Sequence, residues 1–204
     1  MLRLYGSAKS RAVRVLWMLG ELNVPFDHKD WLPRAPETRT PEYRALNGNA
    51  RVPTIDDDGF ILSESMAINF YLARKHKSAL YPADPKVEAR ALQWSLWETD
   101  RLDRQVVNYV RHSKELPEGE RKADVAETCW KEMVESFGVL EAALSKSEWL
   151  CGPAFTVGDL NVAAALYRGL TLDLGKWPKL NAWLRRCWDR PAAKKAREMR
   201  EGKG

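Results

Sequence analysis

The chain of 204 residues is poor in cysteine and has neither a long apolar run nor a large excess of charge. Its three cysteines, Cys129, Cys151 and Cys187, stand far apart, without the spacing of a metal site. An odd and sparse count is typical of a reducing compartment and argues against a disulfide scaffold. No run approaches the ~18 apolar residues that span a bilayer, and Leu2 to Tyr5 is too short for a secretory signal. We therefore expect a cytoplasmic protein with no bound metal and no membrane contact.

Charge is nearly balanced, because 33 lysines and arginines oppose 28 acidic residues for a net charge of +5. Both signs are mixed along the chain, without the basic stripe of a nucleic-acid-binding protein, so we expect no nucleic-acid partner. The exception is the tail from Arg185, where eight cations accompany three anions. This pattern is typical of a solvated C-terminus that frays. The mild positive charge favours an anionic substrate.

The hydrophobic pattern divides the chain into a mixed part and a helical part. The first part predicts strand, helix, strand, short helix, hairpin and helix, at 2–5, 10–22, 26–31, from 40, 54–62 and 66–77. This order predicts an α/β layered domain over residues 1–78. A linker with two prolines follows at 78–85. The remainder predicts an all-α domain at 86–204, with helices at 86–113, 120–145, 156–170, 179–189 and 191–199.

The segment from Asn47 to Lys77 contains the features that indicate a binding site. Val52-Pro53 precedes a β-rich run, and proline in a sheet belongs at the first residue of a strand or at an edge. The bond before proline is also where a cis peptide costs little. The backbone beside Pro53 is suited to pairing with an extended peptide, as a sheet edge is. Asp57-Asp58-Gly59 predicts the turn of a hairpin.

Ser65 is a good N-cap for the helix that follows the hairpin. The start of a helix offers backbone N–H groups and a positive dipole end, which suit a carboxylate. Glu64 stands beside it and is placed to hold an ammonium group. Together these features predict a clamp for an amino-acid group. The alternative is simply a capped helix after a hairpin.

Three motifs resemble the cytosolic glutathione S-transferases. Arg51-Val52-Pro53 followed eleven residues later by Glu64-Ser65 resembles the glutathione-binding half of that family. Tyr5-Gly6-Ser7 with Ser10 and then RVLW at 14–17 resembles its first strand and helix. The sequence FTVGD at 155–159 resembles the helix-capping signature of its C-terminal domain. The resemblance implies a thioredoxin-like N-terminal domain, an all-α C-terminal domain that contributes the electrophile pocket, and a homodimer.

The resemblance also implies roles for the matching residues. The residue before the proline, Val52, pairs its backbone with the cysteinyl part of glutathione across a cis bond to Pro53. Glu64 and Ser65 take the γ-glutamyl end. Arg51 stands where relatives often carry Lys or Gln, and it is suited to contacting the glycyl carboxylate bidentately. Asp100 is a weaker candidate, for reaching the ligand's ammonium across a dimer interface.

Ser10 is the candidate for activating the glutathione thiol. A free thiol with a pKa near ~8.5 is mostly protonated at neutral pH, and a hydrogen bond to the sulfur favours the reactive thiolate. Ser10 combines a hydroxyl with a place at the start of the first helix, and its spacing resembles the serine-using classes, bacterial-like or theta/phi-like. Tyr5 and Ser7 remain rivals, and a plain N-cap is the structural alternative for Ser10.

We therefore predict a glutathione transferase that conjugates the glutathione thiolate to an electrophilic small molecule, with glutathione as co-substrate. Other glutathione-dependent reactions, those of an isomerase, dehalogenase or peroxidase, remain open. The second class of function is a non-enzymatic ligand-binding or interaction module. The Val-Pro and Glu-Ser pairs argue against a module, because it has no need of a ligand clamp.

Overall fold

The computed structural model describes residues 1–202, and the chain forms two compact units. The first unit comprises Met1–Tyr81 together with the chain from Asp189 onward, and the second comprises Pro82–Trp188. The sequence led us to assign everything after residue 86 to one helical domain. The structure differs at the C-terminal end, where the last helix belongs to the first unit.

The first unit is built on a four-stranded mixed sheet with the strand order β2-β1-β3-β4. The strands β1 and β2 are parallel, whereas β3 pairs antiparallel with both β1 and β4. A parallel pair needs a crossover connection, which the first helix supplies. The strand bounds are Leu2–Tyr5, Asp27–Lys29, Thr54–Asp57 and Phe60–Ser63. This confirms the predicted α/β, thioredoxin-like class, although the second strand is shorter than its pattern indicated.

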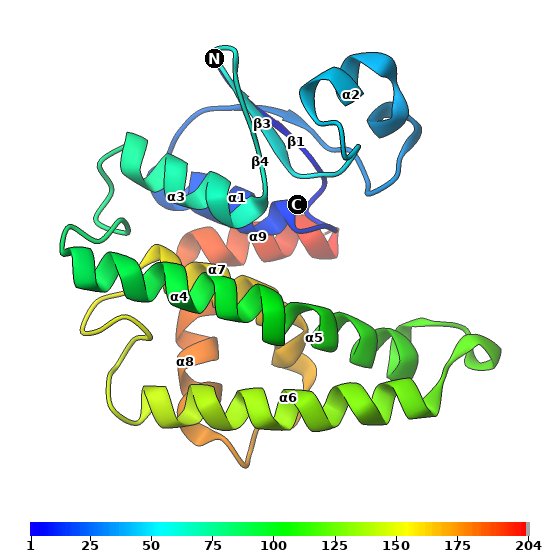
Figure 1. Cartoon of the computed structure of the whole chain (residues 1–204), viewed down its shortest axis with the longest axis vertical. Helices are drawn as coiled ribbons and strands as arrows, with labels where there is room; N and C mark the ends of the chain where they lie inside the picture. The colour runs from blue at the N-terminus through cyan, green and yellow to red at the C-terminus, as the bar shows by residue number, and fades with distance from the viewer. Residues whose placement is uncertain (203–204) are drawn as a thin grey trace. The chain divides into compact units, whose positions relative to one another are not determined.

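Helices cover both faces of this sheet. The helices α1 and α3 lie together on one face, and α2 lies on the other side of the strands (Figure 1). Neighbouring residues of a strand point to opposite faces. Leu4 is therefore buried toward α1 and α3, while Tyr5 packs edge-on against Tyr43 of α2, with ring centroids 5.5 Å apart. The bounds are Ala12–Leu22 for α1, Pro41–Leu46 for α2 and Ser65–Lys75 for α3, with a 3₁₀ turn at Pro36–Arg39.

The C-terminal helix α9, Pro191–Glu201, packs against α1. A Cβ atom at Gly20 would come within 3.0 Å of the Ala192 Cβ, so the two helices are in close contact. Ala193 and Ala196 are buried on the same helix. The expectation of a fraying, solvated tail is therefore wrong for this helix. Lys194, Lys195 and Arg197 are exposed on the other side of this small apolar face, which a count of charges does not reveal.

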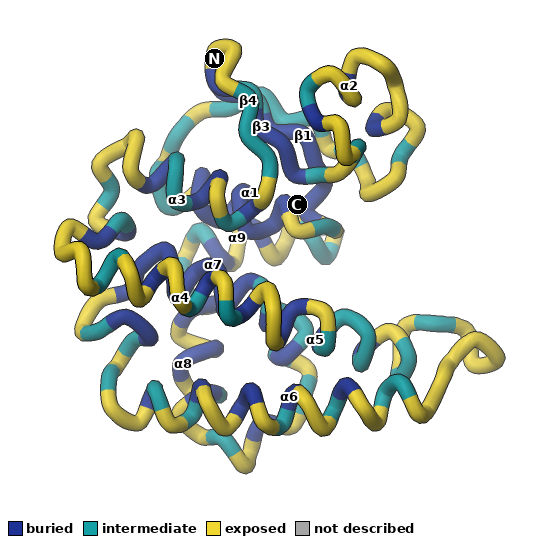
Figure 2. The backbone as a smooth tube through the Cα atoms, viewed as in Figure 1, coloured by how far each residue is buried: buried dark blue, intermediate teal, exposed yellow. Residues whose placement is uncertain are grey.

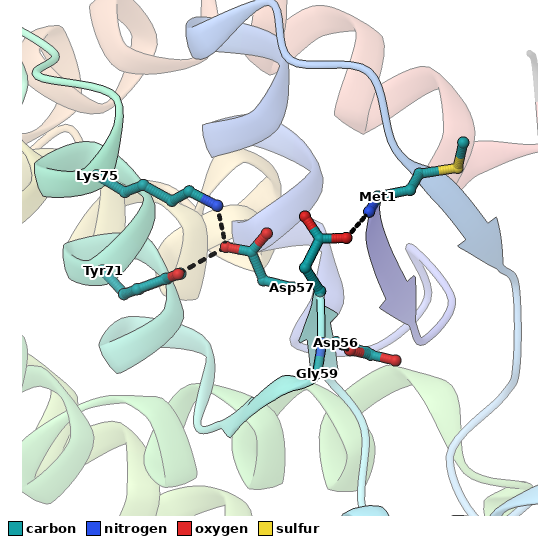
Figure 3. A network of polar contacts seen from close by, with 7 residues as sticks. Met1, Asp56, Asp57, Gly59, Tyr71 and Lys75 are labelled. Atoms are coloured by element: carbon teal, nitrogen blue, oxygen red, sulfur yellow. Dashed lines mark hydrogen bonds and ion pairs between the residues drawn. The ribbon is translucent and has the colours of Figure 1, made fainter.

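The hairpin is tied to α3 by a buried carboxylate. Asp58 and Gly59 have φ of 53° and 92°, the left-handed values that a two-residue hairpin turn of type I′ needs. The Asp57 carboxylate accepts a hydrogen bond of 2.6 Å from Tyr71 and pairs with Lys75 (Figure 3). This contact fixes the hairpin relative to the helix whose first turn carries Ser65.

The second unit is entirely helical, as predicted. One long helix was expected at 86–113, but the chain leaves helical geometry at Leu102, where φ is −124°. No proline or glycine marks this break, and the fully buried Leu102 side chain indicates that tertiary packing sets it. The bounds are Pro85–Arg101 for α4, Asp103–Val110 for α5, Ala123–Leu144 for α6, Val157–Ala165 for α7 and Pro178–Trp188 for α8, with a π turn at Arg111–Glu115 and 3₁₀ turns at Glu118–Glu120 and Leu166–Thr171.

The capping box predicted at Thr156 and Asp159 is present and does more than cap α7. The buried Asp159 carboxylate also accepts hydrogen bonds from the Leu150 amide, at 2.8 Å, and from the Trp183 indole, at 3.0 Å. Burial raises the pKa of Asp159, and these hydrogen bonds oppose that shift. The carboxylate thus joins the loop before α7 to α8.

The three cysteines are buried, as expected for packing residues. Burial raises the pKa of Cys151 to about 12, so this thiol is inert at neutral pH. Within residues 1–202 no helix is both long and apolar enough to cross a membrane.

The Asp57 carboxylate predicts a pH-dependent stability. Burial alone would raise its pKa, but hydrogen bonds from Lys75 and Tyr71 outweigh burial and hold the pKa below the ordinary value of 3.8. Such a group stabilises the fold above its unfolded-state pKa, and the contribution is lost as the pH falls through the folded-state pKa. Asp57→Asn should lower the free energy of unfolding by about 1 kcal/mol at neutral pH.

Urea denaturation from pH 7 down to pH 3 measures this effect. The difference in the free energy of unfolding between wild type and Asp57→Asn should shrink as the pH falls toward 3. The free energy of unfolding of the exposed control Asp30→Asn should match that of wild type at every pH. A difference that stays constant with pH would contradict the assignment.

Candidate active site

Two loops that are distant in sequence meet at Gly6. A Cβ atom placed on Gly6 would lie 3.1 Å from the Val52 Cβ and 3.4 Å from the Pro53 Cα, and its φ of 137° also favours glycine. The Val52-Pro53 peptide bond is cis, as the resemblance implied. His28 supports the same point, since its Nε2 lies 2.9 Å from the Gly6 carbonyl. The end of β1 is therefore in contact with the segment that was predicted to bind an extended peptide.

Ser10 lies in the turn between β1 and α1. The helix begins at Ala12 with Arg11 as its N-cap, so Ser10, the predicted cap, precedes the observed capping residue by one position. Its Oγ accepts a hydrogen bond of 3.0 Å from the Ala12 amide and donates one of 2.7 Å to the Ser7 carbonyl. Ser10 is partly exposed, whereas Ser7 is buried and accepts from the Lys9 amide. The Ser10 hydroxyl is therefore held within the turn, and rotation about its Cβ–Oγ bond would redirect its proton away from the Ser7 carbonyl.

Tyr5 is engaged in packing. Its ring lies 5.1 Å from Trp31 and 5.5 Å from Tyr43, measured between centroids. Its hydroxyl accepts a long hydrogen bond of 3.5 Å from Arg3, which also donates to Asp27 at 2.7 Å. These two hydrogen bonds hold the pKa of Arg3 above its ordinary value. The contacts occupy the Tyr5 side chain on the α2 side of the sheet.

A buried polar network holds the loop before Pro53. The Arg51 carbonyl accepts hydrogen bonds from the Tyr43 hydroxyl, at 2.6 Å, and from the Asn47 side-chain amide, at 3.0 Å. Asn47 also donates to the Thr54 hydroxyl at 3.0 Å. The Arg51 side chain itself is exposed. The backbone of this loop is therefore fixed from below, while the guanidinium remains free to meet a ligand carboxylate.

Sequence reasoning did not select this network. Residues of these types are common in turns and strands. Tyr43, Asn47 and Thr54 come together only because of the path that the loop takes in the fold. The one local signal was the Asn47-Gly48-Asn49 loop.

Glu64 and Ser65 stand at the start of α3. The structure corrects the predicted cap, because Ser65 is the first residue of the helix and Glu64 is the preceding residue, with φ 70°. A positive φ is uncommon outside glycine, and such residues gather at functional sites. The Glu64 side chain is exposed, and its carbonyl accepts the first helical hydrogen bond from Ile68. An exposed carboxylate thus directly precedes the first N–H groups of α3, and the amino-acid clamp stays a prediction.

Arg14 is a buried cation behind this clamp. It is only 4% exposed, in the middle of the otherwise apolar first turns of α1, which Figure 2 shows buried along most of its length. Its guanidinium donates a hydrogen bond of 3.2 Å to the Ser65 hydroxyl, and its carbonyl accepts one from Asn69. Sequence analysis used Arg14 only as part of a motif. The sequence feature that could have identified it is an arginine within a run of apolar residues, since arginine is seldom buried without a partner.

Asp100 belongs to the second unit. It is exposed on α4 and pairs with the neighbouring Arg101 at 2.9 Å. The structure thus gathers Ser10, Ser7, Val52, Pro53 and the α3 terminus in the first unit, and Asp100 is not part of that unit. In the described part of the chain no three His, Cys, Asp or Glu side chains are grouped as metal ligands.

Comparisons with known proteins agree with this arrangement. The family models of the glutathione S-transferase N-terminal and C-terminal domains match residues 10–75 and 99–191. The glutathione S-transferase GstB of Escherichia coli K12 is 30% identical over 202 residues, which cover 96% of this chain and 97% of that protein. The glutathione S-transferase F13 of Arabidopsis thaliana is 29% identical over 94% of this chain and 92% of its own.

A solved structure gives the same result. The theta class glutathione S-transferase of Xanthomonas axonopodis pv. citri, crystallised with glutathione bound, superimposes with a TM-score of 0.89 at 30% identity, covering 96% of each chain. The chain belongs to the glutathione S-transferase family.

The network under Arg51 predicts that Asn47→Ala weakens glutathione binding. The substitution removes two N–H donors from a buried site. We expect the loss to weaken the free energy of glutathione binding by about 1 kcal/mol, which corresponds to about fivefold in the dissociation constant. Isothermal titration with glutathione measures this change. Asn49→Ala, an exposed neighbour in the same loop, is the matched control and should bind as wild type does. Unchanged affinity in Asn47→Ala would show that the loop holds its path without the amide.

Proposed function

We propose that this protein is a glutathione transferase, which joins the glutathione thiolate to an electrophilic carbon of a small molecule. The observation that carries the proposal is the contact of Gly6 with Val52 and Pro53. This contact supports the proposal because Gly6 leads into the Ser10 turn, and Val52 has the backbone that would pair with the cysteinyl part of the peptide. Family membership supports the same activity.

Each charged group of glutathione has a complement in the first unit. The backbone of Val52 pairs with the cysteinyl residue as a strand edge would. The N–H groups at the start of α3 receive the γ-glutamyl carboxylate, and Glu64 receives its ammonium. The exposed Arg51 guanidinium receives the glycyl carboxylate. Because the clamp reads two carboxylates and one ammonium, it selects a zwitterionic peptide over a simple thiol.

Ser10 then lowers the barrier to reaction. When glutathione binds, the Ser10 hydroxyl turns from the Ser7 carbonyl and donates to the sulfur, and the thiol proton leaves to water. The thiolate attacks the electrophilic carbon, forming a C–S bond. Either a leaving group departs with its electron pair, or the adduct takes up a proton. The positive end of α1 favours the anionic sulfur in addition.

The proposal also covers the second substrate, the oligomeric state and the cellular location. The helical unit contributes the electrophile pocket, the protein is a cytoplasmic homodimer, and Asp100 reaches the ammonium of glutathione bound to the partner subunit. Isomerase, dehalogenase and peroxidase reactions would use the same thiolate and differ only in the second substrate. Retention on immobilised glutathione, followed by assay against chlorodinitrobenzene, separates an enzyme from a non-enzymatic module.

Ser10→Ala should lower kcat/KM for chlorodinitrobenzene by about 10- to 100-fold, because a hydrogen bond to a charged sulfur contributes about 1.5–3 kcal/mol. Glutathione should still bind, since its clamp is intact. Tyr5→Phe and Ser7→Ala are the matched hydroxyl controls and should retain most activity. Full activity in Ser10→Ala would refute the assignment, and a large loss in either control would transfer the role to that residue.

Glu64→Gln tests the clamp separately from the chemistry. It should raise the KM for glutathione by about tenfold, since a charge-assisted bond to the ammonium is lost, and leave kcat nearly unchanged. Steady-state kinetics at varied glutathione measure both constants, with the exposed Glu135→Gln as a control on α6. A fall in kcat at constant KM would instead place Glu64 in the chemical step.

A further inference from the structure

The helix α9 is fastened to α1 at its beginning. Arg190, directly before the helix, donates two hydrogen bonds of 2.7 Å to the Glu21 carboxylate. Glu21 also accepts from the indole of the fully buried Trp17 at 2.9 Å. Because Glu21 and Trp17 belong to α1, this ion pair fixes where α9 starts relative to α1.

The other end of α9 reaches the turn that carries Ser10. The Arg200 guanidinium donates a hydrogen bond of 2.7 Å to the Ala8 carbonyl and a longer one of 3.4 Å to the Ser10 carbonyl. The same guanidinium nitrogen makes both bonds. Two carbonyls of one short turn therefore converge on a cation that stands about 190 residues later in the chain.

This turn is also restrained by local hydrogen bonds, among them those of the Ser7 and Ser10 hydroxyls. It precedes the first helical residue of α1, and its backbone bonds run from the Ser10 amide to Ser7 and from the Val13 amide to Ser10, at 2.9 and 3.3 Å. These bonds link neighbouring residues of the turn, whereas the Arg200 contact ties two of its carbonyls to a distant helix. Since a displacement of 1 Å at a reacting group can cost 100-fold in rate, the contact bears on catalysis.

We propose that Arg200 is a positioning residue, which holds the Ser10 turn in the conformation that presents the hydroxyl to the sulfur of glutathione. The inference rests on the proposed function, because it assumes that Ser10 activates the thiol. Arg200 adds a fixed positive charge beside the turn, and this charge favours the thiolate over the thiol. In this way the C-terminal helix becomes part of the glutathione site.

The alternative is that Arg200 only fastens α9. The close contact of Gly20 with Ala192 and the burial of Ala193 and Ala196 already dock the helix on α1. Arg200→Met keeps the unbranched side chain and the helix propensity but removes the donor and the charge. Arg200→Lys keeps the charge and one donor nitrogen. The two variants thus separate packing from positioning.

The experiment measures the pKa of glutathione bound to the enzyme, from the ultraviolet difference spectrum of the thiolate, together with kcat and KM. Arg200→Met should raise that pKa by about one unit and lower kcat/KM at neutral pH about tenfold, with the KM for glutathione nearly unchanged. Arg200→Lys should recover part of both effects. Arg197→Met, whose guanidinium pairs with Glu201 at 2.7 Å on the same helix, is the matched control and should behave as wild type does.

Each result decides the matter. A wild-type pKa and kcat in Arg200→Met would overturn the inference while leaving Ser10 in place, provided that Ser10→Ala loses activity. If wild type shows no lowered thiol pKa, the proposed function fails and the inference with it. Failure of both Arg200 variants to fold, seen by circular dichroism, would make Arg200 a structural residue and would also overturn the proposal.

Discussion

The close approach of Gly6 to Val52 and Pro53 is the constraint on which the site depends. Only a residue without a Cβ fits there, since an added carbon would also lie 2.9 Å from the Ala12 Cβ. The contact exists because β3 pairs antiparallel with β1, with Tyr5 opposite Thr54. The loop that leaves β1 and the loop that enters β3 therefore meet at the same end of the sheet. Sheet register thus brings together the turn proposed to activate the thiol and the backbone proposed to bind the peptide.

The groups proposed to touch the ligand are few and accessible, while the groups that hold them are buried. Arg51 and Glu64 are exposed and Ser10 is partly exposed, whereas Tyr43, Asn47 and Thr54, which hold the loop of Arg51, are buried. A satisfied buried network is rigid, because each group lost would leave a partner without its bond. Binding groups placed on such a support are already ordered before the ligand arrives, so less freedom is lost on binding.

Features encoded within a few residues could be predicted from the sequence, and features that depend on distant contacts could not. The hairpin turn at Asp58 and Gly59, the capping box at Thr156 and the Val52-Pro53 segment each have a local chemical cause. The break at Leu102 and the docking of α9 have none, because packing against distant elements decides them. Ser65 was placed one residue wrong for a related reason, since the positive φ of Glu64 follows from the sheet-to-helix corner and not from residue type.

The cations of the first unit are placed to offset the negative charge that the proposed ionisation of bound glutathione creates. Deprotonating bound glutathione adds a negative charge to a molecule that already carries two carboxylates. Arg51, proposed to meet the glycyl carboxylate, is exposed to solvent, where screening weakens its field. Arg14, behind Ser65, is buried, and Arg200, beside the Ser10 turn, is partly buried, so that the lower local dielectric strengthens their fields. Cations that are fixed before the reaction need no reorganisation as the charge develops, and this is the condition under which electrostatic stabilisation is most effective.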